Sequence, residues 1–248
     1  MSITMYRSSN PVLRTQAFAG QMVGQEQMTV NGTINKILTL FMCILFGALV
    51  TWAVAESNPG LAILLTGVGG FGGFIMCLVI VFSRPAQPGT MMGIYAILDG
   101  FFLGGFTLIM ESMYPGIAMQ AGMGTISVFG VMFMIYRFEI IKPTERFMIG
   151  VSSAMGAVFL IYLLSFFLGF AGMQIPFLHS SGPGGILISL IFIGIAALML
   201  IVDFAVIETG VKNKAPASME WWGAFGLTIT LIWVYIEMVR LISKLRNN

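Results

Sequence analysis

The chain has 248 residues, of which 58% are hydrophobic and only 9% are charged, and its formal net charge is +2. A soluble domain carries roughly 25% charged residues, because water must solvate its surface. The composition therefore excludes a water-soluble globule of this size and predicts an integral membrane protein. The small net charge identifies no partner beyond the lipid bilayer, and we expect no nucleic acid to bind.

Seven stretches are long and apolar enough to cross a bilayer core of about 30 Å, which needs a helix of roughly 20 residues. They are Ile37–Ala55, Leu61–Phe82, Thr90–Met110, Ile117–Tyr136, Phe147–Phe170, Ile186–Ile207 and Trp221–Ile242. The fold class predicted is an all-α membrane protein, a bundle of seven transmembrane helices. We divide the chain into a polar cytoplasmic segment (1–36) without a signal peptide, a transmembrane domain (37–242) and a short basic tail (243–248).

The second stretch contains Gly67, Gly69 and Gly72 in the spacing G-x-G-x-x-G, which is typical of dinucleotide-binding loops. These glycines lie inside an uncharged run of membrane-spanning length, and no acidic residue follows at the roughly 20-residue distance that a ribose contact needs. The nucleotide interpretation is therefore rejected.

Pairs of small residues four positions apart predict close helix packing instead, because they let backbones approach one another in lipid. Gly69 and Gly73 form such a pair in the second stretch, and Gly100 and Gly104 form one in the third. Ser152 and the glycine four residues later form a third pair in the fifth stretch.

Lysine and arginine alternate between successive connections, which places the N-terminus in the cytoplasm by the positive-inside rule. The basic connections follow the second, fourth and sixth stretches. Seven crossings would leave Arg240, Lys244 and Arg246 outside, against that rule. Either this basic end is tolerated or the last segment does not fully cross; we favour seven crossings, in the plasma or inner cell membrane.

Three predicted spans contain an acidic residue: Asp99, Asp203 and Glu237. Ionisable groups are costly in hydrocarbon, so each is a candidate functional residue. At about 1.5 Å per residue, Asp99 and Asp203 lie deep enough on the same side to face one another, directly or through water. A neutral core group for Asp99 and a carboxylate reaching cytoplasmic water for Asp203 are the structural alternatives. Glu237 lies farther out, with Arg240 in reach on the same helix face.

Other candidates carry weaker signals. Glu111 lies at an outer span end, where it could attract cations or simply mark the interface, and Glu208 follows Asp203 at the cytoplasmic end. One histidine and two cysteines are too few to build a transition-metal site, so we expect no tightly bound metal and no resident cofactor beyond transient Ca²⁺. His179 and its neighbouring serines lie in a loop without an orienting acid, and we expect no enzyme.

The stretches "LMLIVDFAVIETG" (198–210), "YAILDGFFLGG" (95–105) and the C-terminal "MEWWGAFGLTITLIWVYIEMVRLISKL" resemble the Bax inhibitor-1/YccA superfamily, in a prokaryotic branch. The resemblance covers nearly the whole chain. It implies a seven-helix fold around a central helix, and a pH-sensitive calcium leak whose closure depends on two aspartates of the last two helices.

The first aspartate of that family pair corresponds to Asp203, and Asp99 stands where many members have Glu. The second corresponds to Thr230 if the ends are aligned, or to Glu237 if the Tyr-x-acid pattern is aligned. Equal depth with Asp203 favours Thr230, so this chain would lack the second aspartate and Asp99 would substitute for it.

The sequence thus predicts a cation channel, for calcium, gated by protonation of carboxylates inside the membrane. The alternative is a membrane interaction protein that transports nothing and regulates a membrane protease or a stress or cell-death response. The intramembrane acids favour the first interpretation, and the polar N-terminal segment favours the second.

Overall fold

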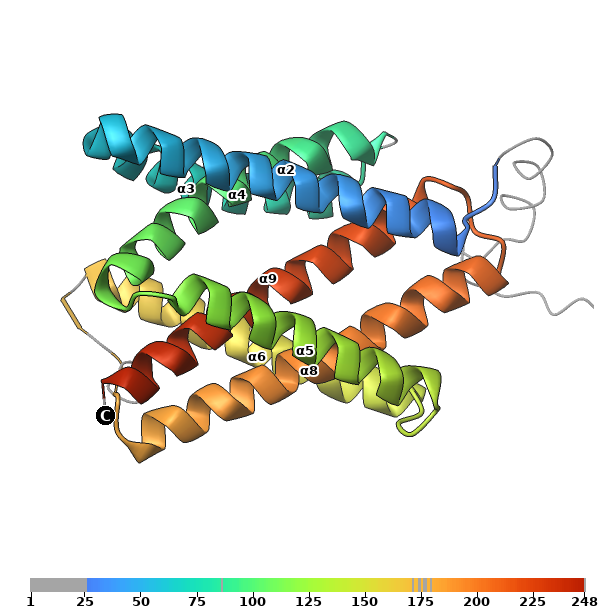
Figure 1. Cartoon of the computed structure of the whole chain (residues 1–248). Helices are drawn as coiled ribbons and strands as arrows, with labels where there is room; N and C mark the ends of the chain where they lie inside the picture. Colours follow the sequence, from blue (N-terminus) through green and yellow to red (C-terminus); the bar gives the residue numbers. More distant parts are fainter. Residues whose placement is uncertain are drawn as a thin grey trace, which may run out of the picture.

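The computed structural model describes residues 26–85, 87–170, 172–173, 175, 178 and 180–247 (Figure 1). In this part of the chain seven helices are long and apolar enough to cross a membrane. They are α2 (Val30–Ser57), α3 (Pro59–Ser83), α4 (Pro88–Met113), α5 (Ile117–Arg137), α6 (Glu145–Phe170), α8 (Pro183–Lys212) and α9 (Met219–Arg246). The predicted seven-helix membrane fold is confirmed.

Capping residues decide where the first two of these helices begin. The Thr29 side chain accepts a hydrogen bond from the Gly32 N–H and starts α2. The Asn58 side chain accepts one from the Leu61 N–H, 3.1 Å away, at the start of α3. Helix α2 therefore begins in polar sequence, before the apolar run, because hydrogen bonding rather than hydropathy sets its first turn.

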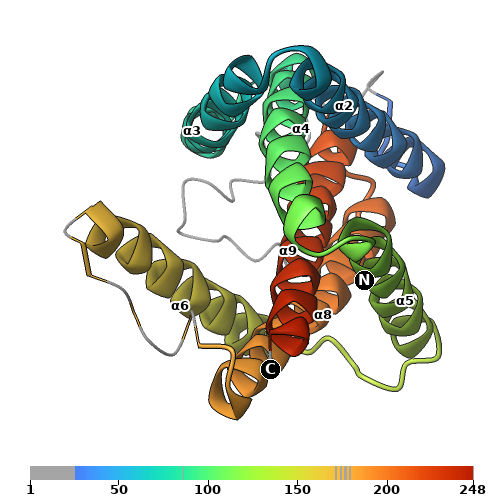
Figure 2. The same ribbon diagram turned by 60° about the vertical axis from the view of Figure 1, so that its left-hand side comes forward.

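Helix α9 lies in the centre of the bundle (Figure 2). Helices α2 and α4 pack against one side of it, and α5 and α8 pack against the other. The two remaining helices are peripheral, with α3 on α2 and α4, and α6 on α8. Among the seven spans α9 is the most buried and α6 the least. A residue on α9 therefore faces different helices according to its position around the helix.

Helix α3 approaches the backbone of α4 at two of the predicted packing glycines. A Cβ at Gly69 would lie 2.4 Å from the Leu98 carbonyl oxygen, which is closer than real atoms come. A Cβ at Gly73 would lie 3.7 Å from the backbone nitrogen of Asp99, an ordinary contact. Only a residue without a side chain fits at the first of these positions.

The opposite face of α4 approaches α2 in the same way. A Cβ at Gly100 would lie 2.3 Å from the Ile44 carbonyl oxygen, and one at Gly104 would lie 2.8 Å from the Cα of Ala48. The third small-residue pair behaves differently, since no described atom lies within 4 Å of a Cβ at Gly156. Among the three predicted pairs, close approach to a neighbouring backbone is thus confined to the α2–α3–α4 unit.

The basic residues at the C-terminal end are bound to other parts of the protein. Lys244 donates hydrogen bonds to the Gly185 carbonyl at the start of α8, 3.0 Å away, and to Ser189. Arg246 donates to the Pro115 carbonyl between α4 and α5, 2.9 Å away. The chain entering α2 instead pairs with the α8–α9 loop, at the other end of α9. Helix α9 therefore runs the full length of the bundle, and Lys244 and Arg246 near its end each bind a backbone carbonyl group and a polar side chain.

Candidate functional site

Two buried threonines of α9 point toward different neighbouring helices. Thr228 and Thr230 are 0% and 3% exposed. Because successive residues of an α-helix are about 100° apart, these two side chains point about 200° apart around α9. Thr230 lies beside α8. Thr228 lies on the same face of α9 as Ala224 and Ile232, which belong to one hydrophobic cluster with residues of α4.

Asp203, on α8, is buried beside Thr230 and Gly226 of α9. Its side chain is within hydrogen-bonding reach of the Thr230 hydroxyl, and a Cβ at Gly226 would lie 3.6 Å from its Oδ1 atom. Its Oδ2 atom is buried and has no hydrogen-bond partner among the described residues. None of the ion pairs in the described part of the chain includes Asp203. It is a buried carboxylate without a cation.

Asp99, on α4, has different neighbours. Gly73 of α3 packs against its backbone, and Cys77 of α3 and Tyr95 of α4 are near enough to interact electrostatically with it. Its Oδ2 atom is also buried without a hydrogen-bond partner in the described residues. Asp99 therefore belongs to the α3–α4 side of the bundle.

The structure gives no support for the expectation that Asp99 and Asp203 face one another. Their depths agree, at about 16 Å from the start of α4 and about 14 Å from the end of α8. However, no interaction among the described residues joins them, and α9 lies between the α3–α4 side and α8. Asp203 instead lies beside Thr230, which is at the same depth. Thr230 is also the residue that equal depth favoured as the counterpart of the family's second aspartate.

Glu237 is 1% exposed and belongs to a polar cluster of its own, which we call the Glu237 cluster: Tyr162, Trp233, Glu237 and Arg240. The Glu237 Oε1 atom accepts hydrogen bonds from the Tyr162 hydroxyl at 2.5 Å and from the Trp233 indole N–H at 3.2 Å. The Arg240 guanidinium is 3.9 Å from Oε1 and lies over the Tyr162 ring, 4.4 Å from its centre. The pairing with Arg240 was expected, but Tyr162 of α6 was missed because no local pattern links it to α9.

The two weaker candidates are engaged in helix-end contacts. Glu111 accepts hydrogen bonds from the N–H groups of Gly116 and Ala118 and so caps the start of α5, with the Ala118 bond at 3.0 Å. Glu208 is bound by the Tyr136 hydroxyl and forms an ion pair with Lys212 at 2.6 Å. His179 lies outside the described residues.

Seven helices of spanning length in the described residues, one of them central and with buried carboxylates on different sides of it, define a multi-pass helical membrane protein with ionisable groups inside its membrane domain. A family model described as "Bax inhibitor 1 like" matches residues 10–247, nearly the whole chain. The chain therefore belongs to the Bax inhibitor-1-like family, as the sequence resemblance predicted. No curated protein matches the chain.

Proposed function

We propose that this protein is a cation leak channel, with calcium as its ion and Asp203 as the carboxylate that controls it. The observation that carries the proposal is the state of Asp203: it is 8% exposed, lies inside a helix of membrane-spanning length, and has no cation beside it among the described residues. Burying such a charge in hydrocarbon costs free energy, and ionisable residues inside the membrane are therefore candidates for a functional role.

The chemistry around Asp203 suits a hard divalent cation. Ca²⁺ is bound by carboxylate, carbonyl and hydroxyl oxygens in flexible geometry. Asp203 supplies a carboxylate, and Thr230 supplies a hydroxyl that is itself bonded to the Gly226 carbonyl at 3.2 Å. In the described residues no three His, Cys, Asp or Glu side chains converge. We therefore propose brief contact with a passing ion, without a tightly bound metal or other cofactor.

Control by pH follows from the same carboxylate. A deprotonated Asp203 attracts a cation, and a protonated one does not. Flux should therefore fall when acidification protonates Asp203, because the site then offers only neutral oxygens. Thr230 cannot take up a proton, so in this proposal one carboxylate, rather than a pair of aspartates, sets the response.

The test is calcium flux into liposomes containing the purified full-length protein, measured across a range of pH. Asp203→Asn should lower the flux and remove most of its pH dependence. Glu145→Gln, an exposed acid at the start of α6, is the matched control and should behave like the wild type. A wild-type protein that passes no calcium, under conditions where it is folded, would reject the proposal.

The alternative is a non-transporting protein that binds and regulates a membrane protein such as a protease. The polar segment 1–36 favours it, since a channel does not require such a segment. The two functions separate cleanly in liposomes: an interaction protein would show no flux at any pH, and removing the N-terminal segment would abolish regulation of its partner. In either case we propose residence in the plasma or inner cell membrane with the N-terminus in the cytoplasm.

A further inference from the structure

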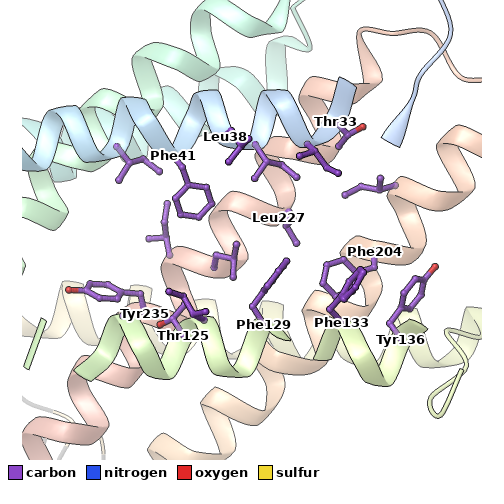
Figure 3. Close-up of a pocket in the computed structure, with 18 of the residues that line it drawn as sticks. Thr33, Leu38, Phe41, Thr125, Phe129, Phe133, Tyr136, Phe204, Leu227 and Tyr235 are labelled. Atoms are coloured by element: carbon purple, nitrogen blue, oxygen red, sulfur yellow. The ribbon is translucent and has the colours of Figure 1, made fainter. Parts of the chain in front are cut away.

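A long apolar groove lies between α2 and α5, with α8 and α9 forming its floor (Figure 3). Its volume is about 1540 Å³, larger than the roughly 300–1,000 Å³ of most small-molecule pockets. Along α2 the lining runs from Val30 to Trp52, which corresponds to about 33 Å of helix. The groove is therefore about as long as the hydrocarbon core of a bilayer is thick.

Aromatic and aliphatic side chains fill the walls and floor of the groove. Phe41 points in from α2, Phe129 and Phe133 from α5, Phe204 from α8, and Leu227 from α9 (Figure 3). Three of these rings also pack on one another, since Phe129 and Phe133 each lie edge-on to Phe204, at 5.5 and 5.6 Å. The groove is thus a preformed apolar surface that reaches the central helix.

All charged residues that line the groove lie at one end of it, where α5 and α8 end. They are Arg137, Glu139, Lys142, Glu208 and Lys212. Glu208 and Lys212 neutralise one another, and Arg137 is also near enough to Glu208 to interact with it electrostatically. Arg137, Glu139 and Lys142 are exposed and form no ion pair within the described residues, so the five side chains together carry one net positive charge. This end therefore offers two cationic side chains to a ligand.

Polar groups at the opposite end of the groove are already satisfied within the protein. The Trp52 indole N–H donates to the Gly104 carbonyl at 2.9 Å, and the hydroxyls of Thr107 and Tyr235 are bonded to one another at 3.1 Å. That end offers no free charge. The groove is therefore polarised, as a binding site for an amphiphile with an anionic head would be.

We propose that the basic half of this groove is a specific site for one anionic phospholipid. Its phosphate is held by Arg137 and Lys142, and its acyl chains lie along Phe41, Phe133 and Leu227. Arginine and lysine both bind phosphate oxygens, and basic pockets between transmembrane helices at the cytoplasmic surface bind anionic headgroups. This site is separate from Asp203 and does not depend on the proposed channel function.

The charge pattern favours a lipid over a protein in this groove. A second copy of the chain, or a partner helix, would have no need of two cations at one end of an otherwise apolar surface. A lipid of the same leaflet reaches only about half of a groove as long as the core is thick, which matches the restriction of charge to one end. Lipid is also present wherever this protein folds.

The experiment is native mass spectrometry of the full-length protein in mixed micelles with equal amounts of phosphatidylglycerol and phosphatidylcholine. Wild-type protein should retain one phosphatidylglycerol in preference to phosphatidylcholine. Arg137→Gln with Lys142→Gln should lower that preference by about tenfold or more, because both phosphate contacts are lost. Arg84→Gln with Lys214→Gln, two exposed basic residues that do not line the groove, is the matched control and should retain it.

A second pair of variants tests the apolar part of the site. Leu38 lines the groove and is 57% exposed, while Leu64 of α3 is 60% exposed and lies elsewhere. Leu38→Trp should reduce retention of both lipids, whereas Leu64→Trp should not. Equal retention of the two lipids by the wild type, or equal losses in the basic variants and their control, would overturn the proposal. A lipid-free dimer that Leu38→Trp dissociates would assign the groove to a second copy and would also overturn it.

Discussion

Asp203 of α8 and Glu237 of the central helix α9 are both buried acids, and each has one carboxylate oxygen without a hydrogen-bond partner among the described residues. The partners of the other oxygen differ. Asp203 has one threonine hydroxyl within reach and no cation among the described residues, whereas Glu237 has two hydrogen-bond donors and an arginine. Glu237 is the more buried of the two, at 1% against 8% exposed. Burial alone therefore does not identify the functional acid; the partners of the carboxylate do.

The difference has a physical basis. A buried charge that is hydrogen-bonded and paired replaces the water it has lost, so it can serve as a structural link. The Glu237 cluster makes such a link, because Tyr162 ties the least buried helix, α6, to α9. Asp203 has lost its hydrating water without equivalent compensation. Binding of a cation or a proton is therefore more favourable at Asp203 than at Glu237. Glu237 should therefore matter for stability and Asp203 for transport.

The largest expected effect is on calcium flux. Asp203→Asn should reduce flux at neutral pH by about tenfold, equivalent to about 1.4 kcal/mol, and should leave the remainder nearly independent of pH. Glu237→Gln should retain the pH response, because the carboxylate it removes is already paired. The measurement is flux against pH in liposomes for both variants. If Glu237→Gln abolishes the response and Asp203→Asn preserves it, the roles of the two acids are reversed.

The same two variants should change stability in the opposite order. Glu237→Gln loses the ionic contact with Arg240 and weakens a charge-assisted hydrogen bond, at a cost of about 1–2 kcal/mol. The melting temperature in detergent should fall by roughly 3–6 °C. Asp203→Asn should melt within about 2 °C of the wild type, since it removes no ion pair. Equal losses in the two proteins would mean that Asp203 also has a structural partner.

A smaller effect is expected for Tyr162→Phe. This change removes the hydroxyl that bonds to Glu237 but keeps the ring beneath Arg240, so it should cost about 1 kcal/mol. Tyr114→Phe, which removes a hydroxyl near the exposed C-terminal end, is the matched control. Thermal unfolding should separate the two, while the flux and its pH response stay unchanged in both. A lost pH response in Tyr162→Phe would show that the Glu237 cluster participates in gating.

The fold was largely predictable from the sequence because hydrocarbon imposes a minimum length of apolar helix. The second predicted span, Leu61–Phe82, differs from α3 by two residues at its start and one at its end. The first span was predicted seven residues too short at its start, since Thr29 caps a polar turn that hydropathy does not detect. Likewise α9 extends to Arg246, because carbonyl groups bind the basic residues of its last turns.

The candidate site was less predictable, for a geometric reason. Counting residues gives the depth of a side chain, and the depths of Asp203 and Thr230 agree as expected. Counting does not give the direction in which a helix is rotated or which helix is its neighbour. The resemblance implied a central helix, but counting could not show that it is α9, and it could not show the bond between Tyr162 and Glu237, which are 75 residues apart.

The smallest expected effect concerns Asp99, and it tests whether α9 separates the two aspartates. Two carboxylates that share a cavity titrate as a coupled pair, and removing one shifts the midpoint of the other by about one pH unit or more. Because Asp99 and Asp203 have different neighbours and no described interaction joins them, Asp99→Asn should leave the midpoint of the flux–pH curve unchanged within error. The stability changes of Asp99→Asn and Asp203→Asn should likewise add in the double variant, to within about 0.5 kcal/mol, as they do for sites without shared partners. Flux against pH and thermal unfolding of the two single variants and the double variant check both statements. A midpoint that moves to lower pH in Asp99→Asn, together with non-additive stability, would place the two acids in one cavity and make Asp99 the second member of the pair.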